Sequence, residues 1–322
     1  MKSAVAVALW LGAALCSLTG CAPKARQVFY VNSYHQGYPS SDEAMGAIRG
    51  LLKEGGVELR VFFLDAKRDP SAAGIARRAG EAADAIRVFQ PDVLIVSDDD
   101  AVKYLVVPHF KNGPLPVVFC GVNWSAAQYG LPTEHVTGML EVVPIEATLR
   151  DVIRRVPSVR KLRVLSEDST SERNNTPLLD PKYRALGLEP SYALVKNFTA
   201  WKSEFVRAQR EADVIYLPTN GAIQGWDRSA AQGWVRNNIR KPVVTCDDFM
   251  MPYAVFGLTK VAREQGEWAA QAALSILDGK RPSQIATVAN QLVRCYWNQQ
   301  LGQKIGFDTP TEKNCQIEDP TQ

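Results

Sequence analysis

Two short apolar runs, residues 116–123 and 242–248, begin with proline and end in small or polar residues. Neither run alternates apolar with polar positions. Such a run is typical of a strand that is buried on both faces of a parallel sheet. The pattern therefore predicts a strand in each run, with polar residues where the strand ends. In open α/β sheets, ligands bind at these strand ends.

Similar segments recur in the same order along the chain. Residues 91–101 are matched by 212–222, and residues 28–33 are matched by 162–167. A single matched pair can arise by chance, since short apolar runs are common. Three pairs in one order indicate that one α/β unit is used twice.

Helices are predicted between these strands, and the alternation is typical of doubly wound parallel sheets in an α/β fold. Ser41 or Asp42 can cap a first helix that ends before Gly55. Asp151 is expected on a solvated helix face, away from the strand ends. The other predicted helices cover residues 72–89, 101–110, 145–156 and 266–277.

Two short segments, 136–139 and 256–258, are predicted to cross between the two units. More than one crossing indicates a hinge of several strands, and two lobes hinged in this way close over a ligand. We expect a signal peptide at 1–20, an N-terminal lobe of 21–138 and 254–280, and a C-terminal lobe of 139–253 and 281–322.

The first residues have the pattern of an export signal. Met1 and Lys2 precede an apolar stretch over 4–15 that is too short to span a membrane. The sequence LTGC, which ends at Cys21, matches the lipobox of bacterial lipoproteins. It predicts cleavage before Cys21 and a lipid on its thiol, so the protein would face the periplasm or exterior from a lipid anchor. An ordinary signal peptide is the alternative.

Composition narrows the set of partners. The chain has 37 basic and 34 acidic residues and a formal net charge of +3, with no basic block. This near balance gives no reason to expect nucleic acid as a partner. No apolar run after the leader approaches membrane-spanning length. We expect a monomer that contacts the membrane through its lipid alone.

Four cysteines remain once the leader and the lipid site are set aside. Cys295 and Cys315 are close in a polar C-terminal segment, and in an exported protein they are predicted to form a disulfide. Cys120 and Cys246 lie at matching positions of the two units. We expect this pair to stay reduced, as small apolar residues. No cysteine and histidine spacing suggests a metal site.

Several tracts carry a resemblance to a known family. VSDDDAVKYL followed by PVVFCGVN, and GEWAAQAALSILDGKRPSQI followed by YWNQQLGQKIGF, resemble ABC transporter substrate-binding proteins of the type I periplasmic-binding fold. The resemblance covers nearly the whole mature chain and implies two Rossmann-like lobes, each a parallel sheet flanked by helices. It also implies an ABC permease as the partner. Relatives include tryptophan or tyrosine uptake lipoproteins, from which this chain differs in its acidic run 98–100, and extracytoplasmic domains of sensor kinases.

Candidate ligand contacts follow the predicted strands of both units. Aspartates at the first lobe's strand ends could hold an ammonium or hydroxyl group, although helix capping and turn formation also favour Asp, Ser and Asn there. Carboxylates on both walls would make the cleft acidic and favour an amine-bearing solute. The candidates are Ser33, Tyr34, Asp98, Asp99, Asn123 and Trp124 in the first unit, and Asp168, Ser169, Asn220 and Asp248 in the second.

Enzymatic signals are weak. The three histidines, His35, His109 and His135, lie beside no candidate nucleophile. No glycine-rich phosphate loop follows the first strand, so no cofactor is expected. Our hypothesis is therefore a binding protein that captures a small polar or amine-bearing solute for an ABC permease. The alternatives are ligand sensing for a membrane sensor kinase and a carboxylate-based hydrolase.

The lipid anchor can be tested by replacing the acceptor thiol. We expect Cys21→Ser to release the protein from membrane fractions, because a serine hydroxyl cannot carry the thioether-linked lipid. Cell fractionation followed by immunoblotting measures this. Unchanged membrane association of the variant would contradict the anchor.

Overall fold

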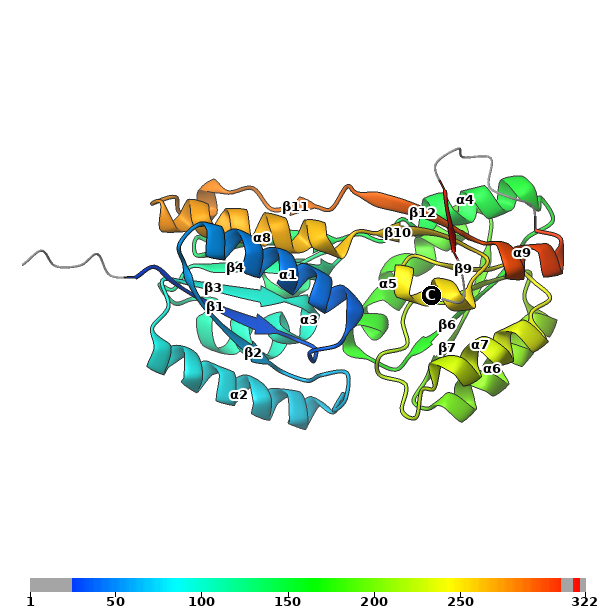
Figure 1. The fold of residues 1–322 in the computed structure, drawn as a ribbon, viewed down its shortest axis with the longest axis horizontal. Helices are drawn as coiled ribbons and strands as arrows, with labels where there is room; N and C mark the ends of the chain where they lie inside the picture. The colour runs from blue at the N-terminus through cyan, green and yellow to red at the C-terminus, as the bar shows by residue number, and fades with distance from the viewer. Residues whose placement is uncertain (1–24, 308–314, 319–322) are drawn as a thin grey trace, which may run out of the picture.

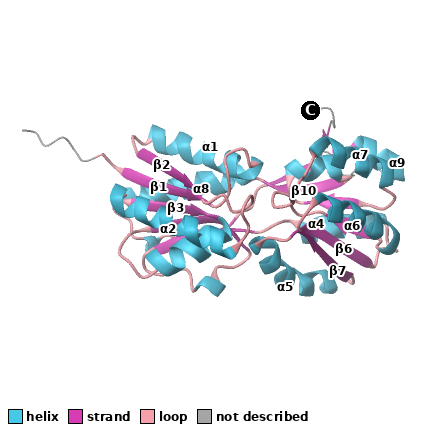
Figure 2. Ribbon diagram, turned by 90° about the horizontal axis from the view of Figure 1, so that it is seen from below, coloured by secondary structure: helices cyan, strands magenta, loops and turns pink. Residues whose placement is uncertain are grey.

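The computed structural model describes residues 25–307 and 315–318. The predicted signal peptide and Cys21 lie outside these residues. The chain forms two α/β lobes side by side, each with one central sheet (Figures 1 and 2). The predicted fold class is therefore confirmed. Among the described residues, no helix is long and apolar enough to cross a membrane.

The sheet of the N-terminal lobe has six parallel strands in the order β11-β5-β4-β3-β1-β2. Its central strands β1, β3 and β4 are buried on both faces because helices cover both, whereas the edge strands β2 and β11 are partly exposed. Phe29 and Val31 of β1 belong to a core with α2 and the π-helical segment η1, whereas Val28 and Tyr30 belong to a core with α1 and α8. The strands are β1 (Gln27–Asn32), β2 (Glu58–Phe63), β3 (Val93–Ser97), β4 (Val117–Asn123), β5 (Val136–Glu141) and β11 (Val288–Ala289).

The helices of this lobe agree with the predicted positions and differ in detail. The predicted helix 101–110 is a short α-helix followed by η1, which contains Pro108. A proline inside a helix removes one backbone donor, and π-helical turns accommodate such breaks. The elements are α1 (Pro39–Glu54), α2 (Ala72–Phe89), α3 (Asp98–Ala101), η1 (Val102–Phe110), η2 (Ala127–Tyr129), α8 (Ala262–Leu277) and η4 (Pro282–Gln284).

Neither Ser41 nor Asp42 caps the first helix, so that prediction is wrong. The helix begins earlier, at Pro39, because the fixed φ of proline suits the first helical turn and its missing N–H leaves no donor unsatisfied there. Asp42 instead accepts a hydrogen bond from Gly37 N at 2.9 Å, which closes the preceding loop.

The C-terminal lobe has a seven-stranded sheet in the order β13-β12-β10-β9-β8-β6-β7, in which β12 is antiparallel to β10. Its strands are β6 (Lys161–Glu167), β7 (Glu189–Val195), β8 (Val214–Tyr216), β9 (Val243–Thr245), β10 (Phe256–Lys260), β12 (Val293–Asn298) and β13 (Gln316–Glu318). Its helices are α4 (Ile145–Arg155), α5 (Thr170–Ala185), α6 (Phe198–Glu211), α7 (Arg228–Asn238), η3 (Asp248–Tyr253) and α9 (Gln299–Ile305).

The chain passes between the lobes after β5, after β10 and between β11 and β12. Strands β10, β11 and β12 lie along one side of the molecule (Figure 1). β10 pairs with β9 and β12 of the second sheet, and β11 pairs with β5 of the first. We therefore propose lobe boundaries that differ slightly from the expected ones, with β10 in the C-terminal lobe and β11 in the N-terminal lobe.

The predicted disulfide is present. Cys295 of β12 is linked to Cys315, just before β13, with Cα atoms 4.4 Å apart. The bond joins the last described segment to the sheet of the C-terminal lobe. Cys120 and Cys246 are free and buried.

Asp151 is buried, so the prediction of a solvated face is wrong. Its side chain is paired with Arg154 and with Arg155, whose Nε lies 2.5 Å from Asp151 Oδ2. Arg155 in turn lies over the ring of Phe307, 5.5 Å from its centroid. The apolar pattern of α4 could not reveal this, because it does not show which parts of the chain cover the charged residues of the helix.

A glycine at the contact between α1 and α8 provides a test of this packing. A Cβ at Gly266 would lie 2.1 Å from Ala44 O, which is backbone and cannot rotate away. We expect Gly266→Ala to lower the free energy of unfolding by about 1–3 kcal/mol, the range for overpacking. Denaturant titration measures it.

Gly50→Ala is the matched control, since Gly50 lies on the exposed face of α1 with no atom within 4 Å of the added Cβ. It should raise the free energy of unfolding by about 0.5–1 kcal/mol, because alanine loses less conformational entropy in a helix. Equal effects of the two substitutions would contradict the close helix contact.

Candidate functional site

Two hollows lie between the lobes, one enclosed and one open. The enclosed one, here called the interior cavity, has a volume of about 40 Å³. The N-terminal lobe contributes Tyr34, Tyr38, Ser40, Lys67, Asp98, Asn123 and Glu141. The C-terminal side, which includes β10, contributes Ser171, Glu172, Asn175, Tyr216, Thr219, Asp247 and Lys260.

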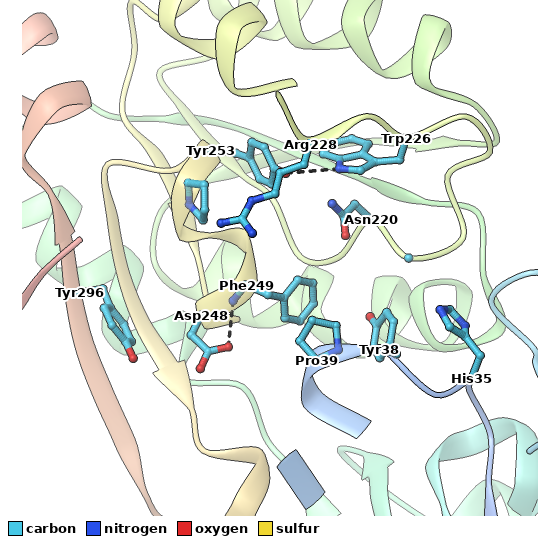
Figure 3. A pocket seen from close by; sticks show the side chains of 12 residues that line it. His35, Tyr38, Pro39, Asn220, Trp226, Arg228, Asp248, Phe249, Tyr253 and Tyr296 are labelled. Atoms are coloured by element: carbon cyan, nitrogen blue, oxygen red, sulfur yellow. Dashed lines mark hydrogen bonds between the residues drawn. The ribbon is translucent and has the colours of Figure 1, made fainter. Parts of the chain in front are cut away.

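The open hollow, here called the outer groove, has a volume of about 500 Å³ and is more aromatic. Figure 3 shows Tyr253, Arg228 and Trp226 on its C-terminal side, facing Pro39 and His35 across the groove. The Trp226 indole N–H donates to Tyr253 Oη at 3.3 Å, which fixes one end of the groove (Figure 3).

Tyr38 lines both hollows and separates them. Its ring makes edge contacts with Tyr34 and Phe249, at centroid distances of 4.8 Å and 5.6 Å. A Cβ at Gly221 would lie 2.3 Å from this ring, so only glycine allows the C-terminal lobe to approach so closely. Tyr38, Phe249 and Gly221 thus form a partition between the interior cavity and the outer groove.

A buried ion pair joins the lobes beside this partition. Lys67 follows β2, Glu167 ends β6, and their side chains are 3% and 0% exposed. Lys67 Nζ also lies 4.5 Å from the centroid of the Tyr34 ring, and Glu167 Oε2 accepts from Ala222 N at 2.7 Å. Burial raises the pKa of Glu167, but the Lys67 charge together with the hydrogen bonds from Lys67, Ala222 and Ser169 outweighs burial, and the net shift is downward.

A second charged group lies where the chain crosses between the lobes. Lys260, the last residue of β10, is paired with Glu141, the last residue of β5, and its Nζ lies 3.2 Å from Asp247 Oδ1. Burial raises the pKa of Asp247 to about 6, against the opposing effect of Lys260. The two carboxylates share one ammonium group.

Two further carboxyls line the interior cavity without a cation of their own. Burial, reinforced by Glu141, raises the pKa of Asp98 to about 8. Burial and the Glu167 charge raise the pKa of Glu172 to about 7. Asp98 also has φ 68°, a conformation that residues with a side chain rarely adopt and that is concentrated at functional sites.

The structure brings five of the candidate residues to the two hollows. Tyr34, Asp98 and Asn123 line the interior cavity. Asn220 and Asp248 line the outer groove, where Asp248 is paired with Arg294 at 3.3 Å. As ligand contacts these residues remain proposals.

Three other candidates support the cavity wall from behind. Ser33 Oγ donates to Ser97 O and accepts from Ala101 N at 2.9 Å, which fixes the start of α3. Asp99 is buried and accepts from Asn123 Nδ2 at 2.6 Å and from Tyr129 Oη at 2.7 Å. Ser169 caps α5 by accepting from Glu172 N.

Two candidates lie away from both hollows among the described residues. Asp168 is paired with Arg173 and is partly exposed. The Trp124 ring packs under Lys182, whose Nζ lies 4.9 Å from the ring centroid. Strand-end position predicted these two residues, but it does not determine which way a side chain points.

The sequence interpretation missed the charged residues that dominate the site. Glu141, Glu167 and Lys260 each occupy the last position of a buried strand. A charge that closes an apolar strand is a usable signal, because it lies at the edge of the sheet where ligands bind. Lys67 lies in a loop and carried no comparable signal.

The comparisons with known proteins agree with this geometry. The chain matches the family of ABC transporter substrate binding proteins over residues 37–313. It belongs to this family. Members bind a solute for an ABC transporter and are not enzymes, so the hydrolase alternative is excluded. A search of curated proteins finds no match.

Solved structures show the same fold at low sequence identity. An ABC domain in complex with L-Trp from Streptococcus pneumonia aligns with a TM-score of 0.71 and 15% identity, over 89% of this chain and 96% of that one. A conserved domain protein from Vibrio cholerae gives 0.72 and 20%, over 89% and 97%. A 5-methylthioribose transporter solute binding protein from Thermotoga lettingae, in complex with that compound, gives 0.59 and 12%, over 89% and 95%.

The ion pair between the lobes generates a prediction for this binding protein. Lys67→Met should lower the free energy of unfolding by about 3–5 kcal/mol or separate the lobes, because it leaves the Glu167 charge buried without a partner. Thermal denaturation and the radius of gyration from small-angle X-ray scattering measure the two outcomes. The double variant Lys67→Met/Glu167→Gln should recover part of the loss.

Arg173→Met is the control, since its partner Asp168 is partly exposed and such pairs contribute about 0–1 kcal/mol. A Lys67→Met protein with the stability and dimensions of the wild type would show that Lys67 does not hold the lobes together.

Proposed function

We propose that this protein captures a small polar solute in the interior cavity, favours one that carries an amine, and delivers it to the permease of its ABC transporter. The observation that carries the proposal is that polar side chains of both lobes line one enclosed cavity. At about 40 Å³ the cavity is smaller than the roughly 300–1,000 Å³ of ordinary ligand pockets, so the lobes would lie further apart around a solute than they do here. A solute held by both walls stabilises that closed form, since a ligand shifts a conformational equilibrium by its preference for one state.

Three residues support the choice of the interior cavity over the outer groove. Asp98 and Glu172 offer carboxyls from opposite lobes, and Asn123 is held in place through Asp99. Such fixed polar groups give a solute site its specificity. The outer groove, which is open and mostly aromatic, then serves as the approach to the cavity when the lobes separate and Gly221 moves away from the Tyr38 ring.

The proposed cellular position follows from Cys21. A lipid on this residue would hold the two lobes at the outer face of a membrane, and the described chain begins only a few residues later. The solute would then be captured outside the cytoplasm and passed to a permease in the same membrane. We propose that the protein acts as a monomer.

The site can be tested with the solute that accompanies the protein. Native mass spectrometry after mild purification identifies this solute, and calorimetry gives its affinity. We expect Asp98→Asn to weaken binding by about 1.5–3 kcal/mol, the contribution of a hydrogen bond to a charged group.

Arg228→Gln, an exposed change in the outer groove, should leave the affinity unchanged. Equal affinity of Asp98→Asn and the wild type, or a loss confined to Arg228→Gln, would place the binding site elsewhere. Circular dichroism of both variants verifies that the fold is intact.

A further inference from the structure

The interior cavity has more carboxyl groups than its own cations are paired with. Lys67 is paired with Glu167, and Lys260 is paired with Glu141 and Asp247. Asp98 and Glu172 remain. None of the described residues donates a hydrogen bond to the Asp98 carboxyl, and Asn175 Nδ2 donates to Glu172 Oε1 at 3.0 Å without bringing a charge.

The cavity also offers acceptors that have no donor. Asn175 is 9% exposed and lines the cavity, and its Oδ1 has no hydrogen-bond partner. With Nδ2 donating to Glu172 Oε1, the Asn175 amide leaves Oδ1 as its free acceptor. The Thr219 hydroxyl, also at the cavity wall, has no partner and can accept or donate. A buried acceptor without a donor is costly, so these groups indicate a ligand that donates.

We propose that the solute is an organic cation whose ammonium or guanidinium N–H groups bind Asp98, Glu172 and Asn175 Oδ1, and that it displaces the protons that the two carboxyls hold in the empty cavity. This inference rests on the proposed function and specifies the class of solute. Because the two carboxyls lie on opposite lobes, with an acceptor beside one of them, a cation with a donor at each end can contact both walls.

The exchange is a proton transfer without redox chemistry. The O–H bond of each protonated carboxyl breaks, the proton leaves to the buffer, and the carboxylate then accepts an N–H of the cation. One positive charge thus replaces another in the cavity. The two carboxyls therefore carry no uncompensated negative charge either in the empty cavity, where protons neutralise them, or in the loaded cavity, where the cation does. Such a charge would otherwise hold the lobes apart.

The charged groups around the two carboxyls set the direction of the pH dependence. Asp98 faces Glu141 and Asp99, which favour its protonated form, and Lys67 and Lys260, which oppose it. Burial prevails, and the pKa of Asp98 is raised to about 8.

Glu172 faces Glu167, which favours its protonated form, whereas Lys67 and the hydrogen bonds of Ser166 and Asn175 oppose it, and burial raises its pKa to about 7. In the empty closed cavity both carboxyls therefore hold a proton at higher pH than they would in water. A bound cation lowers both pKa values, so affinity should rise with pH.

The experiment uses two pairs of matched probes, namely 1,4-diaminobutane with 1,4-butanediol, and L-arginine with L-citrulline. Each pair has nearly the same shape and differs in charge. Calorimetry at pH 7 in phosphate and in MOPS, neither of which is a net cation, gives the number of protons released, because the two buffers differ in ionisation enthalpy. We expect at least one cation to bind at least tenfold more tightly than its neutral counterpart, with release of about one proton.

Asp98→Asn and Glu172→Gln should each reduce both the proton release and the affinity, and wild-type affinity should fall at least tenfold from pH 8 to pH 6. Asp168→Asn is the control, since this carboxylate lies outside the cavity and should change neither quantity. Failure of both cations to bind, or binding without proton release, would overturn the inference.

A neutral or anionic solute recovered from the native protein, whose affinity falls in Asp98→Asn, would overturn the cation while leaving the proposed function intact. Recovery of a cation whose binding releases protons in the wild type, and releases fewer in Asp98→Asn and Glu172→Gln, would support both the proposed function and the cationic class of the solute.

Discussion

The closed arrangement of this protein depends on the rule that a buried charge must be compensated. Lys67 and Glu167 are almost completely removed from solvent, and each is provided by a different lobe. Separately, either would be a buried ion with several kcal/mol of desolvation penalty. The closed lobes therefore adopt the relative orientation in which the Lys67 ammonium contacts the Glu167 carboxylate. The rings of Tyr34 and Tyr38 pack against this ammonium group.

Much of the fold could be predicted because it is encoded locally. Uninterrupted apolar runs such as Val93–Ser97 and Val117–Asn123 form parallel strands that helices cover on both faces. The helix Ala72–Phe89 was predicted at its observed ends, where Ser71 caps the first turn. The π-helical segment around Pro108 and the burial of Asp151 escaped prediction, since the apolar pattern of a helix determines neither its hydrogen-bond spacing nor the exposure of its charged residues.

The site was less predictable than the fold for a related reason. Strand ends selected Tyr34, Asp98 and Asn123, which line the interior cavity, but the same rule selected Asp168 and Trp124, whose side chains point elsewhere. The pairing of Lys67 with Glu167 joins residues from different lobes, and no local pattern records which loop faces which strand. An accurate site prediction requires the relative placement of the lobes, which only the hinge geometry supplies.

The partition formed by Tyr38 and Gly221 has a kinetic consequence. For a solute held in the interior cavity, the Tyr38 ring blocks the way to the outer groove, and the absence of a side chain at Gly221 lets the opposite lobe press against that ring. Escape then requires the lobes to separate. The lifetime of such a complex is set by how often the protein opens, so two solutes of very different affinity can have similar residence times.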